Sequence, residues 1–161
     1  MPTARGSRTI AAPAERLWEV IRDPHHLPRW WPRVKRVESV DGDAFTEVMT
    51  TAKGKLVRAD FHVVLMAEDD HHLMWEQRVR GTPFERVLRA AETEVLLTPV
   101  QAEAPPRLGA EPEEGPGATE VTIELRQTLN GLSVRFGGFM VRRAAAATVQ
   151  EALDGLERIS A

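Results

Sequence analysis

The chain has 161 residues, of which 42% are apolar, carries a formal net charge of −3, and contains four tryptophans but no cysteine and no tyrosine. This length predicts a single domain, 1–161, that can bury a sizeable core without disulfide bonds. The composition excludes disulfides, thiolate metal sites, a cysteine nucleophile and a phenol as acid or base, and the slightly acidic charge argues against nucleic acid as a partner.

The first ten residues are polar, and none of the apolar stretches in the chain is long. We therefore expect no signal peptide, which needs a hydrophobic segment of about 7–15 residues. We also expect no integral membrane segment, because a membrane helix needs roughly 18 apolar residues. The expected location is cytoplasmic.

The N-terminal part predicts one strand and two short helices. The strand ends at Ile10, and Pro13 stands where the first turn of a helix tolerates a missing N–H. This helix stops before Pro24, because the residue before a proline avoids the α conformation. Its apolar face consists of Leu17, Trp18 and Ile21. A second short helix is expected between the prolines at 24 and 32.

The middle of the chain alternates apolar and polar residues, which is typical of strands. Strands are expected within 34–40, 44–51, 57–65, 73–79, 87–97 and 121–129. Since no helices separate them, they predict an antiparallel meander. One face of the fifth of these strands is expected to hold Val87, Arg89, Ala91, Thr93, Val95 and Leu97.

Two further segments complete the chain. Residues 101–117 are rich in proline, glycine and glutamate, which predicts a flexible hairpin insertion without a core of its own. Helical spacing returns over 132–159, in a stripe that includes Phe136, Phe139 and Met140. Gly137 and Gly138 predict a bend or a close approach near the start of this long helix.

The motifs of this chain resemble those of the polyketide cyclase/dehydrase and lipid-transport superfamily, also called START-like, Bet v 1-like or SRPBCC. The resemblance rests on the segment 10–24, on Leu27-Pro28-Arg29-Trp30-Trp31-Pro32, and on the tail from Phe136 to Leu156. It implies an α+β helix-grip fold, in which a curved antiparallel sheet of about seven strands surrounds a long C-terminal helix, with two short helices near the N-terminus. It also implies an internal cavity for a hydrophobic small molecule.

Several apolar residues are candidates to line such a cavity. Trp30 and Trp31 are adjacent, so we expect one of them to face the mouth of the cavity, and we take this to be Trp31. Trp75 lies on the apolar side of its strand and could line the cavity or simply pack in the core. The remaining apolar candidates are Phe61, Val63, Phe136 and Met140.

Three polar residues interrupt strand faces that are otherwise apolar. They are Gln77, Arg89 and Gln127. A polar group on an inward face needs a partner or a ligand, because burying it unpaired costs a few kcal/mol. These residues could orient a polar group of the ligand, with Arg89 contacting an anion or a carbonyl. Alternatively, they pair with one another, or a bulge turns them outward.

No pattern in the sequence predicts a metal site or a cofactor. The five histidines lack the spacing of a helical metal site, and no phosphate-binding loop, dinucleotide fingerprint or nucleophile elbow is present. We therefore expect neither metal nor cofactor, and the sequence assigns no catalytic residue.

Three functions are compatible with these patterns. The first is binding or transport of a hydrophobic small molecule. The second is a polyketide aromatase/cyclase or dehydratase acting in the same cavity, although the lack of tyrosine removes a donor that such enzymes use. The third is a chaperone-activator-like interaction module, which predicts a large exposed apolar patch. The oligomeric state stays open.

Overall fold

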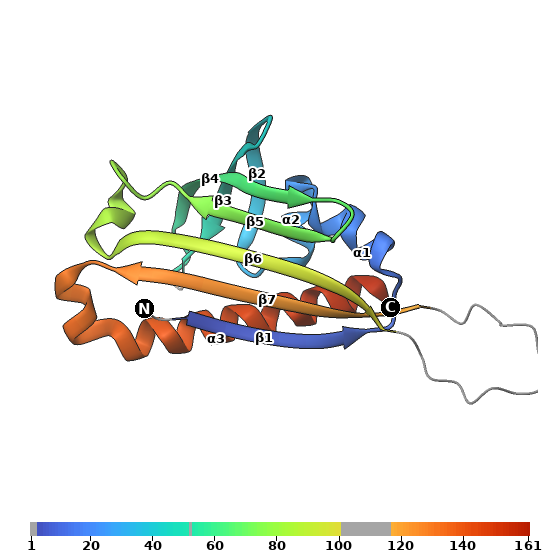
Figure 1. The fold of residues 1–161 in the computed structure, drawn as a ribbon. Helices are drawn as coiled ribbons and strands as arrows, with labels where there is room; N and C mark the ends of the chain where they lie inside the picture. The colour runs from blue at the N-terminus through green and yellow to red at the C-terminus, as the bar shows by residue number, and fades with distance from the viewer. Residues whose placement is uncertain (1–2, 52, 101–116) are drawn as a thin grey trace, which may run out of the picture.

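Seven antiparallel strands and one long helix make up the computed structural model, which describes residues 3–51, 53–100 and 117–161, and of 132–136 the backbone alone. The expected α+β helix-grip architecture is confirmed (Figure 1). The segment 101–117, expected to be a flexible hairpin insertion, lies outside the described residues except for Gly117.

The sheet is a meander closed by the first strand. Its strands are β1 (Thr3–Ile10), β2 (Val34–Asp41), β3 (Ala44–Thr50), β4 (Leu56–Ala67), β5 (His72–Gln77), β6 (Leu88–Val100) and β7 (Ala118–Leu129). Their spatial order is β1-β7-β6-β5-β4-β3-β2, and each neighbouring pair is antiparallel. The connections from β2 to β5 are short, which favours pairing of consecutive strands, and β1 pairs with the other edge of β7.

The two N-terminal helices predicted from the sequence are present, but the second is only partly a regular α-helix. The first, α1, spans Ala14–Ile21 and buries its apolar face. The expected second helix consists of a 3-10 turn, η1 (Pro24–His26), followed by a single α-helical turn, α2 (Leu27–Trp30). The helix ends there because Pro32 favours an extended backbone at Trp31, which has φ −84° and ψ 131°.

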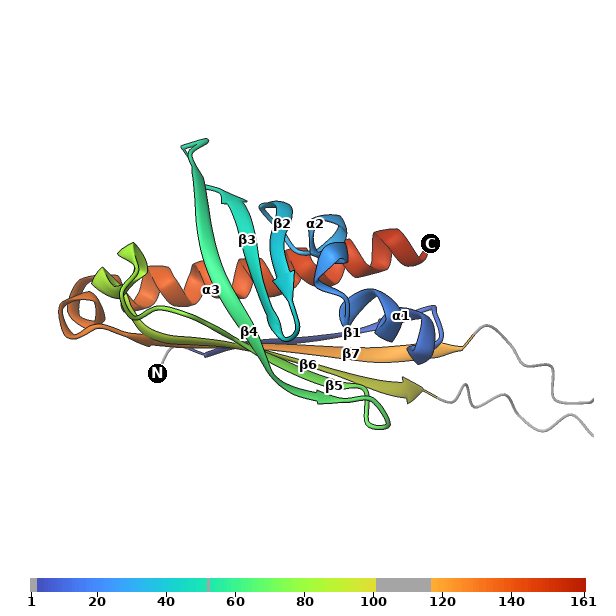
Figure 2. The ribbon, with the colours of Figure 1, turned by 90° about the horizontal axis from the view of Figure 1, so that it is seen from above.

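The long helix α3 (Gly131–Ser160) lies along β1 and β7, while β2, β3 and β4 reach over it (Figures 1 and 2). Within the described residues, no helix is both long enough and apolar enough to span a membrane. The C-terminal half of α3 is the tightly packed half. Four side chains of this half are no more than 1% exposed, namely Val149, Ala152, Leu153 and Leu156.

Glycines permit the closest contacts of α3. A Cβ atom added to Gly155 would lie 2.8 Å from the Cα atom of Trp30 on α2, and one added to Gly6 on β1 would lie 2.8 Å from Val149. By contrast, a Cβ at Gly137 or Gly138 would meet no atom within 4 Å. Of the two alternatives expected at Gly137–Gly138, the close approach is therefore wrong and the bend stays a prediction, while the close contact with a neighbouring helix occurs at Gly155.

Two β-bulges change which residues face inward. In β4 the register shifts between Val63 and Leu65, so that Leu65 is 37% exposed and leaves the face of Phe61. In β6 the register shifts between Leu88 and Ala90, so that Leu88 is buried and its two neighbours are exposed. A bulge adds one residue and reverses the alternation beyond it, which the sequence alone did not reveal.

We expect Gly155→Ala to lower the free energy of unfolding by about 1–3 kcal/mol, because the added methyl group would press against the backbone of Trp30. The control is Gly138→Ala, where the methyl group has room and alanine favours the helix by about 1 kcal/mol. Denaturant unfolding measures both variants. Equal stability of the two would contradict the packing described for Gly155.

Candidate functional site

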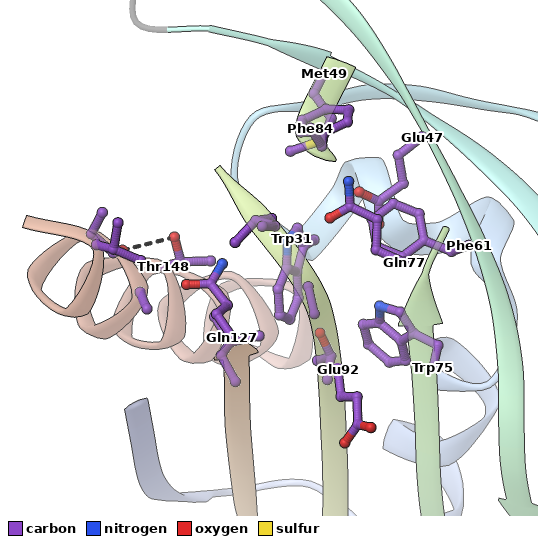
Figure 3. A pocket seen from close by; sticks show the side chains of 17 residues that line it. Trp31, Glu47, Met49, Phe61, Trp75, Gln77, Phe84, Glu92, Gln127 and Thr148 are labelled. Atoms are coloured by element: carbon purple, nitrogen blue, oxygen red, sulfur yellow. Dashed lines mark hydrogen bonds between the residues drawn. The ribbon is translucent and has the colours of Figure 1, made fainter. Parts of the chain in front are cut away.

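A pocket of about 290 Å³ lies between the concave face of the sheet and the N-terminal half of α3. Its apolar lining comes from Trp31, which follows α2, and from the sheet, the 3-10 turn η2 (Pro83–Arg86) and α3 (Figure 3). The aromatic members are Trp31, Phe61, Trp75 and Phe84, and the aliphatic ones include Met49, Leu88, Leu125 and Val141. The polar members are Glu47, Gln77, Glu92, Thr93, Gln127 and Thr148.

Five of the nine candidate residues from the sequence line this pocket. They are Trp31, Phe61, Trp75, Gln77 and Gln127. Trp31 and Trp75 pack edge to face, with ring centroids 5.6 Å apart. Of the two adjacent tryptophans, Trp31 lines the pocket and Trp30 packs in the core, which is one of the arrangements expected for them. Both are buried, and their rings meet edge to face. The extended backbone at Trp31 turns its ring toward the sheet while Trp30 packs against α3.

The other four candidates lie elsewhere or outside the described side chains. Val63 packs against the core without lining the pocket. Arg89 is exposed on the outer face beside Arg78 and Arg80, because the bulge in β6 turns it away from the interior. Met140 is 73% exposed on α3, so its expected inward position is also wrong. The side chain of Phe136 is outside the described part of the chain.

Met140 does not face the pocket because of how α3 lies against the sheet. The apolar stripe of the sequence ran through both halves of α3, but most of the described α3 side chains that are fully buried lie in its C-terminal half. Further toward the N-terminus the pocket separates part of the helix from the sheet, although Val141 still packs against Leu88 and Leu129. There Val141, Ala144, Ala145 and Thr148 form the face toward the pocket instead.

The sequence reasoning missed Glu47, the most unusual residue of the site. Glu47 on β3 is only 2% exposed, and it lines the pocket together with Met49 two residues further on. Phe45, Glu47 and Met49 alternate along the strand, so a charged residue between two apolar ones on the same face was the signal that could have revealed it.

The surroundings of Glu47 favour its uncharged form. Its strand neighbours are Val37 on β2 and Ala59 on β4, and no hydrogen bond or ion pair to its carboxyl group occurs in the described part of the chain. Burial raises the pKa of Glu47 to about 8, because water no longer solvates the charge and no cation replaces it. At neutral pH the group is therefore mainly a protonated acid that can donate a hydrogen bond.

Two glutamines add unpaired polar atoms to the same pocket. The Nε2 atom of Gln77 and the Oε1 atom of Gln127 are buried and have no hydrogen-bond partner among the described residues. By contrast, the hydroxyl group of Thr148 donates to the carbonyl oxygen of Ala144. The expected pairing of the inward polar residues with one another is therefore not observed for these two atoms. Both can take a partner from a bound molecule.

An outer hollow of about 490 Å³ adjoins the pocket. Val57, Pro83 and Val87 belong to its wall, and all three lie outside the pocket lining. Four residues line both spaces, namely Phe84, Leu88, Gln127 and Val141. The ring of Phe84 on η2 therefore lies at the boundary between the outer hollow and the pocket.

Comparison with known proteins relates both sequence and fold to one family. Residues 1–160 match the family described as polyketide cyclase / dehydrase and lipid transport. No curated protein matches the chain.

Solved structures share the fold at low sequence identity. A START superfamily protein from Mycobacterium smegmatis has a TM-score of 0.72 and 16% identity over 98% of this chain and 96% of its own. A protein from Thermus thermophilus has a TM-score of 0.69 and 20% identity over 98% of this chain and 95% of its own. The di-domain ARO/CYC BexL of the BE-7585A biosynthetic pathway has a TM-score of 0.74 and 18% identity, covering 98% of this chain and 46% of its own.

We expect Glu47→Gln to stabilise the protein more at pH 8 than at pH 5. The pKa of Glu47 rises from 4.5 in the unfolded chain to about 8 in the folded protein. At pH values between these two, Glu47 keeps a proton in the folded protein that it has released in the unfolded chain. Wild-type stability therefore falls as pH rises through this window, by up to about 1.4 kcal/mol per pH unit relative to the variant. Denaturant unfolding at several pH values measures the difference.

The control for this experiment is Glu38→Gln on β2. Hydrogen bonds from Arg36 and Arg58 lower the pKa of Glu38, so its carboxylate contributes stability that is present above the ordinary pKa and lost in acid. The two variants should thus change stability with opposite signs at pH 8. A pH-independent effect of Glu47→Gln would show that Glu47 is ionised in the folded protein.

Proposed function

Because the chain belongs to the polyketide cyclase / dehydrase and lipid transport family, we propose that its pocket binds or carries a hydrophobic small molecule. The observation that supports this most directly is the pocket itself, with its aromatic and aliphatic lining between sheet and helix. Apolar walls with a few polar groups are typical of small-molecule sites.

The size of the pocket narrows the range of ligands. Its volume of about 290 Å³ is just below the roughly 300–1,000 Å³ that ligand pockets span. The rings of Trp31, Phe61, Trp75 and Phe84 offer flat apolar surfaces. A compact ligand with one or two rings fits these dimensions better than a long acyl chain does.

A second candidate function is a polyketide aromatase/cyclase or dehydratase reaction in the same pocket. Glu47 favours it, because a carboxyl group that stays protonated near neutral pH is a suitable general acid. Arg89, the residue that the sequence offered for contact with a carbonyl, lies on the outer face and takes no part in this candidate. Incubation with a synthetic poly-β-ketone tests it, and absence of turnover by the wild-type protein would reject it.

We expect native mass spectrometry of the protein purified from its own host to show a retained small molecule. In vitro, Ala91→Phe should weaken binding of naphthalene at least several-fold, because Ala91 on β6 lines the pocket and the larger ring would fill it. Isothermal titration calorimetry measures the affinity. The matched control is Ala90→Phe, since the neighbouring Ala90 lies on the outer face. Equal affinities of the two variants would place binding outside the pocket.

We expect Phe84→Ala to speed both association and dissociation of naphthalene several-fold with a smaller change in affinity. The ring of Phe84 lies at the boundary between the outer hollow and the pocket, so its removal should open a route between them without removing most of the lining. Stopped-flow fluorescence of the tryptophans measures the rates. Phe139→Ala, at a side chain 76% exposed on α3, is the control. Unchanged rates for Phe84→Ala would exclude this route.

A further inference from the structure

Three polar groups face an otherwise apolar pocket and have no partner among the residues that the structure describes. They are the carboxyl group of Glu47, the Nε2 atom of Gln77 and the Oε1 atom of Gln127. Figure 3 shows Glu47 and Gln77 on the side of β3 and β5, and Gln127 on the side next to α3. An unpaired buried polar group costs about 1–3 kcal/mol, so a molecule that pairs with all three would recover this energy.

The charged groups around the pocket do not neutralise a carboxylate at Glu47. The other titratable residue in the lining is Glu92, whose carboxylate accepts a hydrogen bond from Arg126 at 3.2 Å. The residues of β2 and β4 directly opposite Glu47 are Val37 and Ala59, and the described side chains of α3 that line the pocket are uncharged. With no cation beside it in the described part of the chain, burial keeps Glu47 protonated at neutral pH. The carboxyl O–H and the amide N–H of Gln77 are then two donors, and Gln127 supplies an acceptor.

On the basis of the proposed function, we propose that the pocket selects an uncharged ligand whose carbonyl or ether oxygen accepts hydrogen bonds from Glu47 and Gln77, and that it excludes carboxylates. A ligand hydroxyl group on the opposite side would donate to Gln127. This preference for uncharged ligands with an acceptor oxygen follows from the O–H donor of Glu47 and the N–H donor of Gln77. A hydrocarbon leaves these donors unpaired, and a carboxylate brings a second acid into a space that already disfavours charge.

The experiment compares three probes of similar shape, namely acetylnaphthalene, isopropenylnaphthalene and naphthoate. The first carries a carbonyl oxygen where the second has a methylene group, and the third is an anion. Calorimetry with the wild-type protein at pH 6.5 should show the ketone binding about tenfold more tightly than the alkene, since one good hydrogen bond contributes about 1.4 kcal/mol. Naphthoate should bind more weakly than either.

Two variants separate the role of Glu47 from that of pocket shape. Glu47→Leu removes the donor at similar size, so ketone and alkene should bind with nearly equal affinity. Glu47→Gln keeps an N–H donor that does not ionise, so the preference should persist. Raising the pH to 9.5 should reduce the preference in the wild-type protein, because Glu47 loses its proton, but not in Glu47→Gln.

Each outcome is decisive. Equal binding of ketone and alkene by the wild-type protein, or an unchanged preference in Glu47→Leu, would overturn the selection while leaving the proposed function intact. Tighter binding of naphthoate than of the ketone would overturn it in favour of an anion site. Failure of all the naphthalenes to bind would reject the proposed function together with this inference.

Discussion

The close contact between α3 and α2, at Gly155 and Trp30, is the constraint on which the pocket depends. A side chain at Gly155 would collide with the backbone of Trp30, so a glycine at this position lets the helix reach α2. The C-terminal half of α3 is thereby held against β1 and β7, with Val149, Leu153 and Leu156 fully buried. Further toward the N-terminus of α3, Val141, Ala144 and Ala145 line the pocket, which separates this part of the helix from part of the sheet.

The same arrangement explains the chemistry of the pocket walls. Where helix and sheet touch, the residues are aliphatic and close-packed. Where they separate, Glu47, Gln77 and Gln127 face the space between them. In a close-packed interior their unpaired polar atoms would be destabilising, and Glu47 adds a proton equilibrium that opposes folding as pH rises. Polar groups that destabilise the fold in this way are typical of functional sites, where a ligand can pair with them.

Alternation along the strands predicted much of this site, and it failed where the backbone is irregular. Phe61, Trp75, Gln77 and Gln127 face the pocket as their strand patterns indicated. Arg89 faces outward because one extra residue in β6 reverses the alternation, and Leu65 leaves its predicted face for the same reason. A bulge depends on how two strands pair, so the pattern of one strand does not reveal it. Glu47 was missed because a charged residue in a strand is usually exposed.

The sequence by itself determined the order and type of the elements, the antiparallel meander and the long C-terminal helix. These follow from local periodicity and from prolines at fixed positions, which act over a few residues. Only the tertiary structure decided which side chains of α3 pack in the core, which border the pocket, and that the carboxyl group of Glu47 is enclosed with no counterion among the described residues. The solvation of a side chain depends on residues far away in the chain. For Glu47 these are the pocket walls contributed by Trp31, β5 and α3, which meet only in the folded protein.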